Sequence, residues 1–356
     1  MSRVLVTGGA GFIGSNLADR LAREGHDVLV YDALARAGVE QNLEWLKRSH
    51  PDRIESVTAD VRDEDALSRA AHDADAVFHM AAQVAVTTSL VDPLDDFETN
   101  IRGTVNVLEA VRGAGRQAPV IFASTNKVYG GLYDVTMDEG SDAYQPADDA
   151  IRARGISEER PLDFHTPYGC SKGAADQYVL DYCRSFGIPT CVMRMSCIYG
   201  QRQMGTEDQG WVAHFLIQAL QGRPITIYGD GKQVRDIMDV YDAVDAYMAA
   251  WKQIERVKGR AFNLGGGPAN AVSLRQLVRH IERLTGEEVE IDYGDWRAGD
   301  QRYYVSDTRR VREELDLKPA RDWKGGVANL AHWLQQERPG LRRESRAEPM
   351  TAGAAL

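Results

Sequence analysis

The stretch that decides the fold lies at the start of the chain and reads, from residue 4 to residue 14, Val-Leu-Val-Thr-Gly-Gly-Ala-Gly-Phe-Ile-Gly. Its first three residues are apolar and predict a buried strand, and the pattern from Phe12 to Leu21 predicts a helix. Regularly spaced glycines between them let the backbone turn sharply and approach a pyrophosphate; they are Gly8, Gly11 and Gly14. The helix then offers free N–H groups and the positive end of its dipole to the phosphates. The stretch therefore predicts a dinucleotide-binding turn.

Further apolar runs follow, each in turn followed by a helical pattern: Val28-Leu29-Val30, Ala76-Val77-Phe78 and Val120-Ile121-Phe122. Runs that are apolar throughout, rather than alternating, are typical of strands buried on both faces of a parallel sheet. The alternation of strands and helices predicts the α/β class, with a doubly wound parallel sheet of the Rossmann type.

The chain is long enough, at 356 residues, to hold a second and smaller unit. We assign residues 1–200 to the dinucleotide-binding domain, with an acidic, irregular insertion at 130–163. Residues 201–340 are expected to form mainly a mixed α/β lobe that binds substrate, with some segments returning to the first domain. Within this lobe, Ser273 to Leu284 reads as a helix that begins with a capping box. The polar tail at 343–356 is expected to be disordered.

The composition limits the classes of binding partner and the cellular compartment that we expect for the protein. The chain has 42 basic and 53 acidic residues, and its net charge of −11 argues against a nucleic-acid or anionic-membrane partner. No apolar run approaches the roughly 20 residues that span a bilayer, and because strand-like residues begin at Arg3 we expect no signal peptide. The cysteines form no Cys-x-x-Cys pair, so we expect reduced thiols, no metal site and a cytoplasmic protein; they are Cys170, Cys183, Cys191 and Cys197.

An acidic residue at the end of the second strand bears on the choice of cofactor. Asp32 can accept hydrogen bonds from both hydroxyls of the adenosine ribose and would repel a 2′-phosphate, which favours NAD over NADP. Arg36 lies nearby and could weaken this preference. Asp60 and Val61 follow the third strand, where the adenine would lie.

Three side chains form the candidate catalytic group. Tyr168 and Lys172 are spaced so that both lie on one face of a helix start. A lysine ammonium near a phenol favours the phenolate, and NAD⁺ adds a second positive charge, so the tyrosine is expected to act as a base near neutral pH. Ser124 and Thr125 end the fifth strand, at the edge where such sheets bind ligands. A hydroxyl there can share the proton of a sugar alcohol.

Five motifs together carry a resemblance to a known family: Gly-Gly-Ala-Gly-Phe-Ile-Gly (8–14), Asn100-x-x-Gly103, Ser-Thr-x-x-Val-Tyr-Gly (124–130), Tyr168-x-x-x-Lys172 and Tyr-Gly-Asp-Gly-x-Gln-x-Arg-Asp (228–236). They resemble the extended short-chain dehydrogenases that act on nucleotide sugars. The resemblance implies a homodimer through a four-helix bundle, built from helices near 95–115 and 170–186.

The resemblance also implies which residues bind each ligand. NAD would be held by Gly8, Gly11, Phe12, Ile13, Gly14, Asp32, Asp60, Val61, Ala81, Gln83, Asn100, Ser124, Tyr168 and Lys172. The nucleotide sugar would be held by Asn126, Lys127, Gln203, Trp211, Tyr228, Arg235, Arg297 and Asp300. Arginine forks match phosphate oxygens in a bidentate manner, which suits Arg235 and Arg297 to the diphosphate.

Epimerisation, 4,6-dehydration and one-way oxidation are all possible on this scaffold. The related dehydratases place an Asp and a Glu directly after the catalytic Thr, where this chain has Asn126 and Lys127. An amide cannot donate the acid proton, and an ammonium cannot act as the base, so dehydration is disfavoured.

Longer segments resemble the CDP-paratose 2-epimerase subgroup of the family; they are 124–130, 162–178, 208–212 and 42–46. This resemblance implies inversion at carbon 2 of a CDP-linked deoxyhexose through a transient 2-keto sugar, with NAD recycled. Cys197 departs from the family, because many relatives have an Asn there that binds the sugar nucleotide. The nucleotide that carries the sugar could also be GDP or UDP instead of CDP. The alternatives are a 4-epimerase that uses the same residues and a non-catalytic NAD(H)-sensing protein.

Overall fold

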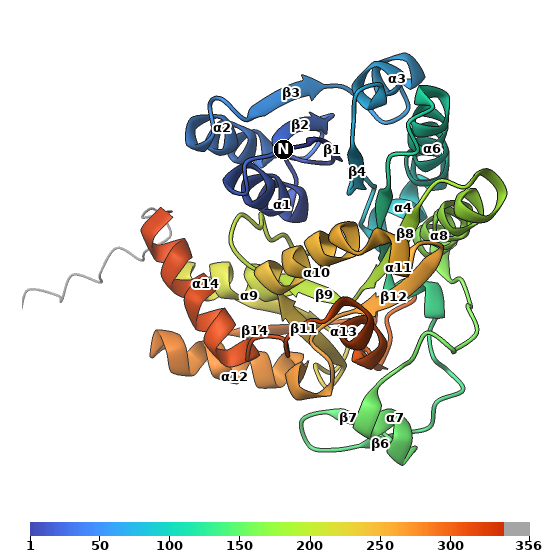
Figure 1. Ribbon diagram of the computed structural model, residues 1–356. Helices are drawn as coiled ribbons and strands as arrows, with labels where there is room; N and C mark the ends of the chain where they lie inside the picture. The colour runs from blue at the N-terminus through green and yellow to red at the C-terminus, as the bar shows by residue number, and fades with distance from the viewer. Residues whose placement is uncertain (338–356) are drawn as a thin grey trace, which may run out of the picture.

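Seven parallel strands form the central sheet of the computed structural model, which describes residues 1–337 (Figure 1). In their order across the sheet they are β12 (Arg260–Leu264), β8 (Thr190–Met195), β5 (Val120–Thr125), β4 (Ala76–His79), β1 (Arg3–Thr7), β2 (Asp27–Asp32) and β3 (Ile54–Thr58). This order confirms the doubly wound parallel sheet. The predicted tail at 343–356 lies outside the described residues.

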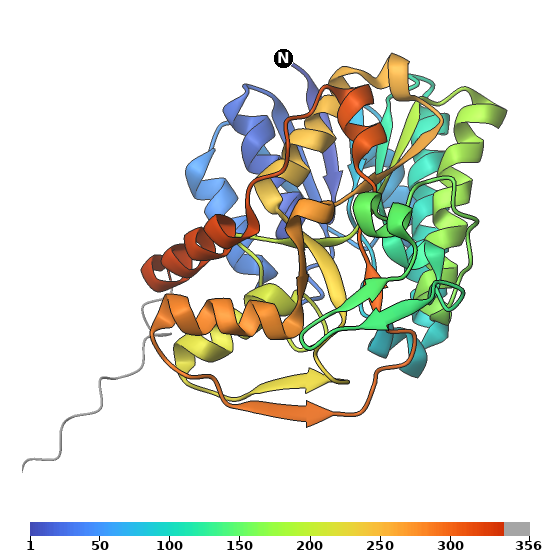
Figure 2. The ribbon, with the colours of Figure 1, turned by 90° about the horizontal axis from the view of Figure 1, so that it is seen from below.

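Helices cover both faces of the sheet, as Figure 2 shows. One face packs against α1 (Phe12–Arg23), α2 (Val39–Ser49), α10 (Val240–Lys252), α11 (Ile254–Val257) and α13 (Arg309–Leu315). The other packs against α3 (Glu64–Ala71), α6 (Gly103–Ala114) and α8 (Thr166–Phe186). Within β1, Val4 and Val6 belong to the first core and Leu5 to the second, so the uninterrupted apolar run reflects burial on two sides.

The helix predicted near 95–115 is divided. It consists of α5 (Pro93–Phe97), a π-helical turn η1 (Glu98–Arg102) and α6, and α4 (Val86–Val91) precedes it. A Cβ on Gly103 would lie 2.6 Å from the side chain of Val61, so glycine lets this helix approach the loop after β3. π-turns often mark functional sites, and this one carries Asn100.

The second lobe has its own core and its own small sheets. One sheet contains β9 (Cys197–Tyr199), β11 (Val234–Asp239), β13 (Ala271–Ser273) and β15 (Tyr303–Tyr304), and β10 (Ile225–Tyr228) pairs in parallel with β14 (Ile291–Gly294). Its helices are α9 (Trp211–Gln221), α12 (Leu274–Thr285) and α14 (Trp323–Glu337). The capping box predicted at Ser273 is present, with Gln276 as its second member. No helix among residues 1–337 is long and apolar enough to cross a membrane.

The insertion is more regular than the sequence predicts. It contains a hairpin of β6 (Met137–Glu139) and β7 (Tyr144–Pro146) and the short helix α7 (Asp149–Arg154), which lie together beyond the end of the central sheet (Figure 1). Polar contacts fasten the hairpin to the second lobe: the Tyr144 hydroxyl donates to Asp230 at 2.5 Å, Lys232 pairs with Glu139 at 2.7 Å, and Arg279 pairs with Asp142 at 2.8 Å. These partners lie far away in the sequence, so local pattern alone could not predict the order.

Candidate active site

The glycine loop lies where the strand order reverses, because β2 and β4 flank β1 on opposite sides. Ligands of doubly wound sheets bind at such a point, outside the carboxyl ends of the strands. Gly8 has a φ of 67°, and a Cβ on it would lie 2.6 Å from the backbone nitrogen of Ala81, which follows β4. A Cβ on Gly14 would clash with the carbonyl oxygen of Gly8. The loop is therefore a cradle of closely packed backbone, with no room for a side chain at Gly8 or Gly14.

The cradle has the donors and the acceptor that a dinucleotide needs. Helix α1 begins at Phe12 and Ile13, and its N-cap residue Gly11 offers no side chain to the N–H groups of the first turn. These groups point at the loop and suit a pyrophosphate. Asp32 accepts hydrogen bonds from the backbone N–H of Ala10 at 3.0 Å and of Leu34 at 2.8 Å, so its carboxylate is held at the rim of the same loop.

Asp60 and Val61 lie together beyond β3 but differ in surroundings. The carboxylate of Asp60 pairs with Arg62 at 2.6 Å, and hydrogen bonding from that guanidinium lowers the pKa of Asp60. Val61 is buried, and its carbonyl accepts from the Asn106 side chain at 3.1 Å. Val61 thus faces the interior, while the Asp60 carboxylate serves a surface ion pair.

Asn100 joins the loop after β4 to the catalytic helix. Its side-chain oxygen accepts from the backbone N–H of Gln83 at 2.9 Å. Its amide nitrogen donates to the carbonyl of Gln83 at 3.0 Å, to Asp96 at 3.2 Å and to the Ser171 hydroxyl at 3.0 Å. The Gln83 side chain also donates to Asp96, at 3.0 Å. These bonds tie the loop after β4 to the start of α8, so Asn100 positions both segments.

The three candidate catalytic residues lie where β5 ends and α8 begins. Tyr168 and Lys172 are both buried in the first turns of α8, and the Thr125 hydroxyl lies close enough to the Tyr168 phenol to favour its ionised form. The ammonium of Lys172 lies 4.2 Å from the ring centre of Phe122. The structure therefore brings together the phenol and the hydroxyl that the sequence predicts as partners.

The electrostatics of this group differ from the sequence prediction. Burial raises the pKa of Tyr168 to about 12, and the bond from Thr125 only partly offsets this. Burial lowers the pKa of Lys172 to about 7, against the opposing effect of Asp176 and Asp96. The protein alone thus does not make the phenol acidic. The predicted lowering requires a positive charge beyond the protein's own, which oxidised nicotinamide carries.

A buried ion pair behind the site is not among the residues predicted from the sequence. Arg194 on β8 makes a bidentate contact with Asp176 on α8, with both bonds at 2.9 Å. Ser124 donates to the same carboxylate at 2.8 Å. Asp176 stands one helical turn beyond Lys172, so this pair fixes the catalytic helix against β5 and β8. The Tyr168-x-x-x-Lys172 spacing, extended by one more turn, is the signal that could have found Asp176.

Five predicted substrate residues form a first cluster next to Thr125. Arg235 donates to Asp300 at 2.6 Å, and Lys127 donates to the carbonyl of Gly299 at 3.1 Å. Asn126 accepts from the Thr125 hydroxyl at 3.3 Å, and Trp211 donates to the sulfur of Cys197 at 3.4 Å. Charge effects on the half-buried Cys197 thiol from both Arg235 and Lys127 place that thiol in the same cluster.

Two other predicted residues lie in a second cluster. The Arg297 guanidinium stacks 3.9 Å from the ring centre of Tyr228 and pairs with Asp208 at 3.2 Å. Tyr228 and Arg297 both contact Glu207, so they hold the segment before α9. Gln203 is nearly buried at the start of that segment and donates to the carbonyl of Ile198 at 3.2 Å.

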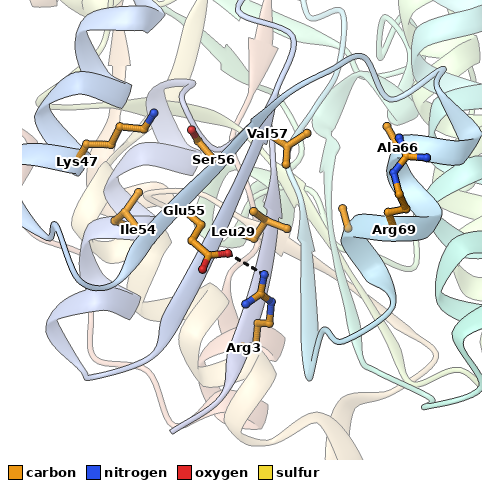
Figure 3. Close-up of a pocket in the computed structure, with 10 residues that line it drawn as sticks. Arg3, Leu29, Lys47, Ile54, Glu55, Ser56, Val57, Ala66 and Arg69 are labelled. Atoms are coloured by element: carbon orange, nitrogen blue, oxygen red, sulfur yellow. Dashed lines mark hydrogen bonds and ion pairs between the residues drawn. The ribbon is translucent and has the colours of Figure 1, made fainter.

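A surface hollow of about 590 Å³ lies apart from both clusters, along the outer strand β3 (Figure 3). Its wall includes the ion pair of Arg3 and Glu55 at 2.8 Å and the side chains of Val57 and Arg69. The residues that line it come from β1, β2, β3, α2 and α3, and none of them is a predicted catalytic, cofactor or substrate residue. We therefore leave it out of the candidate active site.

Comparisons with known proteins agree with this geometry. The model of the NAD dependent epimerase/dehydratase family matches residues 4–265. The chain is 41% identical to CDP-paratose 2-epimerase of Salmonella typhi over 93% of this chain and 98% of that protein. Two UDP-glucose 4-epimerase structures, each 30% identical, cover 94% of this chain and 99% of theirs. The Thermotoga maritima enzyme, solved with UDP-glucose, has a TM-score of 0.80, and the Thermus thermophilus enzyme, in complex with NAD, has 0.79.

Proposed function

Since the chain belongs to the NAD-dependent epimerase/dehydratase family, we propose that it inverts carbon 2 of a CDP-linked deoxyhexose with NAD as a recycled cofactor. The observation that carries the proposal is the end of β5. Thr125 lies next to the buried Tyr168 there, and the next positions hold an amide, Asn126, and an ammonium, Lys127. Dehydration would need acidic groups at these positions, whereas epimerisation needs only a base and a hydride acceptor.

In the proposed reaction, each residue of the site has a separate role. Tyr168 takes the proton from the 2-hydroxyl of the sugar, and Thr125 bridges the two oxygens. Bound NAD supplies a reversible hydride acceptor at this place. Lys172 contributes positive charge that stabilises the phenolate. Arg235 and Arg297 anchor the diphosphate while the 2-keto sugar turns its other face, so no net oxidation occurs.

A 4-epimerase is the nearest alternative. It would use the same Tyr168, Thr125 and Lys172, and two UDP-glucose 4-epimerases share the fold of this chain. What favours carbon 2 is the 41% identity to CDP-paratose 2-epimerase across nearly the full length of both chains. A 4-epimerase and a 2-epimerase form different products, so product analysis separates the two activities.

A panel of CDP-, GDP- and UDP-sugars, incubated with the purified protein without added cofactor, tests the proposal. We expect NMR to show inversion at carbon 2 of a CDP-sugar, because cofactor bound during expression suffices for a reaction with no net redox change. Inversion at carbon 4, or a requirement for stoichiometric NAD, would contradict the proposal.

The cofactor preference can be tested at Asp32. Asp32→Asn removes the charge that repels a 2′-phosphate and one charged acceptor for the ribose. We expect the preference for NAD over NADP to fall by about 10- to 100-fold, measured by titrating cofactor-free protein with each nucleotide. Asp27→Asn is the matched control, because Asp27 begins the same strand and pairs with Arg53 at 2.7 Å. An unchanged preference in Asp32→Asn would place the ribose elsewhere.

We also propose a homodimer through the face of α4, α5 and α8, which pack against one another on one side of the sheet (Figure 1). Large apolar side chains there are exposed; they are Val91, Leu94, Phe97, Tyr178 and Phe186. An apolar patch of this kind marks an interaction surface. Leu108, on the predicted bundle helix, is buried in the core and takes no part.

Light scattering tests the dimer. We expect the wild type to have about twice the chain mass of 39.4 kDa and Leu94→Glu to shift toward the monomer, because a charge would be buried at the interface. Leu284→Glu is the control, since Leu284 is exposed on α12, in the second lobe. A wild type that is monomeric at micromolar concentration would refute this interface.

We place the protein in the cytoplasm. All four cysteines are free thiols, and proteins of reducing compartments keep their cysteines in this form. Nucleotide sugars and NAD are also metabolites of that compartment.

A further inference from the structure

Lys127 stands between the catalytic group and the diphosphate clamp. We propose that its ammonium binds the phosphate that carries the sugar, and that this contact selects carbon 2 for the reaction. The inference rests on the proposed function and goes beyond it, because it names the residue that determines which carbon reacts.

The backbone of Lys127 is tied to the catalytic hydroxyl. Residues Asn126–Tyr129 form a short 3-10 helix, η2, directly after β5. Thr125 caps this helix, since its hydroxyl oxygen accepts from the backbone N–H of Lys127 at 3.2 Å. The base of the Lys127 side chain is therefore held beside Thr125. Its ammonium end reaches the second lobe, where it donates to the carbonyl of Gly299 at 3.1 Å.

The charges around this ammonium are unbalanced. Lys127 lies 3.9 Å from Asp300, and Arg235 lies 2.6 Å from the same carboxylate oxygen. The side chains of Lys127, Arg235 and Asp300 are 20%, 8% and 23% exposed, so two cations share one carboxylate in a largely buried cluster. The other charge effect on Lys127 comes from the Cys197 thiol, whose pKa burial raises, so it stays neutral. Surplus buried charge is costly unless an anion completes the site.

The geometry of a nucleotide sugar decides what that anion is. The sugar is linked to its phosphate through carbon 1, and carbon 2 is the direct neighbour of carbon 1. When carbon 2 faces Tyr168 and Thr125, the linking phosphate must lie close to Thr125 as well. When carbon 4 faces them, the whole ring separates the phosphate from Thr125. The first arrangement brings the linking phosphate nearest to a cation that begins beside Thr125 and ends beside Arg235.

Binding of nucleotides without the sugar tests the contact independently of turnover. CDP carries the phosphate that would link to the sugar, and CMP lacks it. We expect Lys127→Met to weaken CDP by about 10- to 100-fold in isothermal titration calorimetry and to change CMP little. Lys127→Arg should retain most of the CDP affinity. Lys127→Gln serves as a second neutral variant should the Met variant not fold.

Lys232→Met is the matched control. Lys232 also lies near Arg235 in the sequence and is only 16% exposed, but it pairs one to one with Glu139 at 2.7 Å. Its loss should leave the ratio of CDP to CMP affinity unchanged. With the CDP-sugar that the wild type inverts, the KM of Lys127→Met should rise together with the dissociation constant of CDP.

The outcomes separate this inference from the proposed function. If the wild type inverts carbon 2 while Lys127→Met binds CDP like the wild type, or loses CDP and CMP affinity equally, the inference is wrong and the function stands. If the wild type inverts another carbon while Lys127→Met loses CDP affinity selectively, the phosphate contact stands. The selection of carbon 2 then falls together with the proposed function.

Discussion

Tyr168→Phe is expected to lower turnover by about 10²- to 10⁴-fold while NAD stays bound. The substitution removes one oxygen, which is the group that must accept the proton of the sugar alcohol. Tyr168 is 8% exposed, and its ring remains in the variant, so packing at the start of α8 should be kept. The measurement is the inversion rate by NMR, together with the amount of nucleotide released when the protein is denatured.

Tyr178→Phe is the control for this experiment. Tyr178 lies on the same helix, on the proposed dimer face, where phenylalanine keeps the aromatic ring, so turnover of this variant should match the wild type. If Tyr168→Phe retains more than about a tenth of the wild-type rate, another group must take the proton, since one general base contributes at least that much. A bound-nucleotide content that falls with the rate would instead assign Tyr168 to cofactor binding alone.

Lys172→Met is expected to lower the turnover rate and to raise the stability of the cofactor-free protein. Turnover should fall by about 10²- to 10³-fold, because the positive charge that stabilises the phenolate is lost. The cofactor-free variant should nevertheless be more stable than cofactor-free wild type at neutral pH. Burial lowers the pKa of Lys172 from its ordinary 10.5 to about 7, so folding withdraws a proton that the unfolded chain would keep.

The pH dependence gives the sign of this effect. Between about pH 7 and pH 10.5 the unfolded chain holds more protons at Lys172 than the folded chain does. The stability of the wild type should therefore rise with pH in this window through Lys172, and Lys172→Met should lack that rise. The Tm advantage of the variant should thus be present at pH 7 and shrink toward pH 10. A variant that is less stable than the wild type by the same amount at every pH would contradict this account.

Much of the fold follows from local pattern. Strands with uninterrupted apolar runs, such as Val4-Leu5-Val6, are typical of burial on both faces, and the glycines before α1 permit the tight turn that a side chain at Gly8 or Gly14 would block. These features depend on neighbours in the sequence. The parallel sheet and the place of the glycine loop were predictable for this reason.

The features that could not be predicted depend on distant partners. The hairpin at 137–146 is held by Asp230, Lys232 and Arg279 of the second lobe. The sequence of the insertion does not predict these contacts. The π-turn at Asn100 arises where the helix meets Val61. The spacing of Tyr168 and Lys172 located the catalytic group, but their pKa values depend on burial, which a sequence pattern does not measure.

The central claim is that carbon 2 loses and regains the same hydrogen within one active site. A CDP-linked deoxyhexose carrying deuterium at carbon 2, incubated in ordinary water without added NAD, tests it most directly. We predict inversion at carbon 2 with the deuterium retained in the product, as NMR and mass spectrometry would show. Inversion with the deuterium replaced by solvent hydrogen would mean that a proton, and not a hydride, is transferred, and would contradict the account.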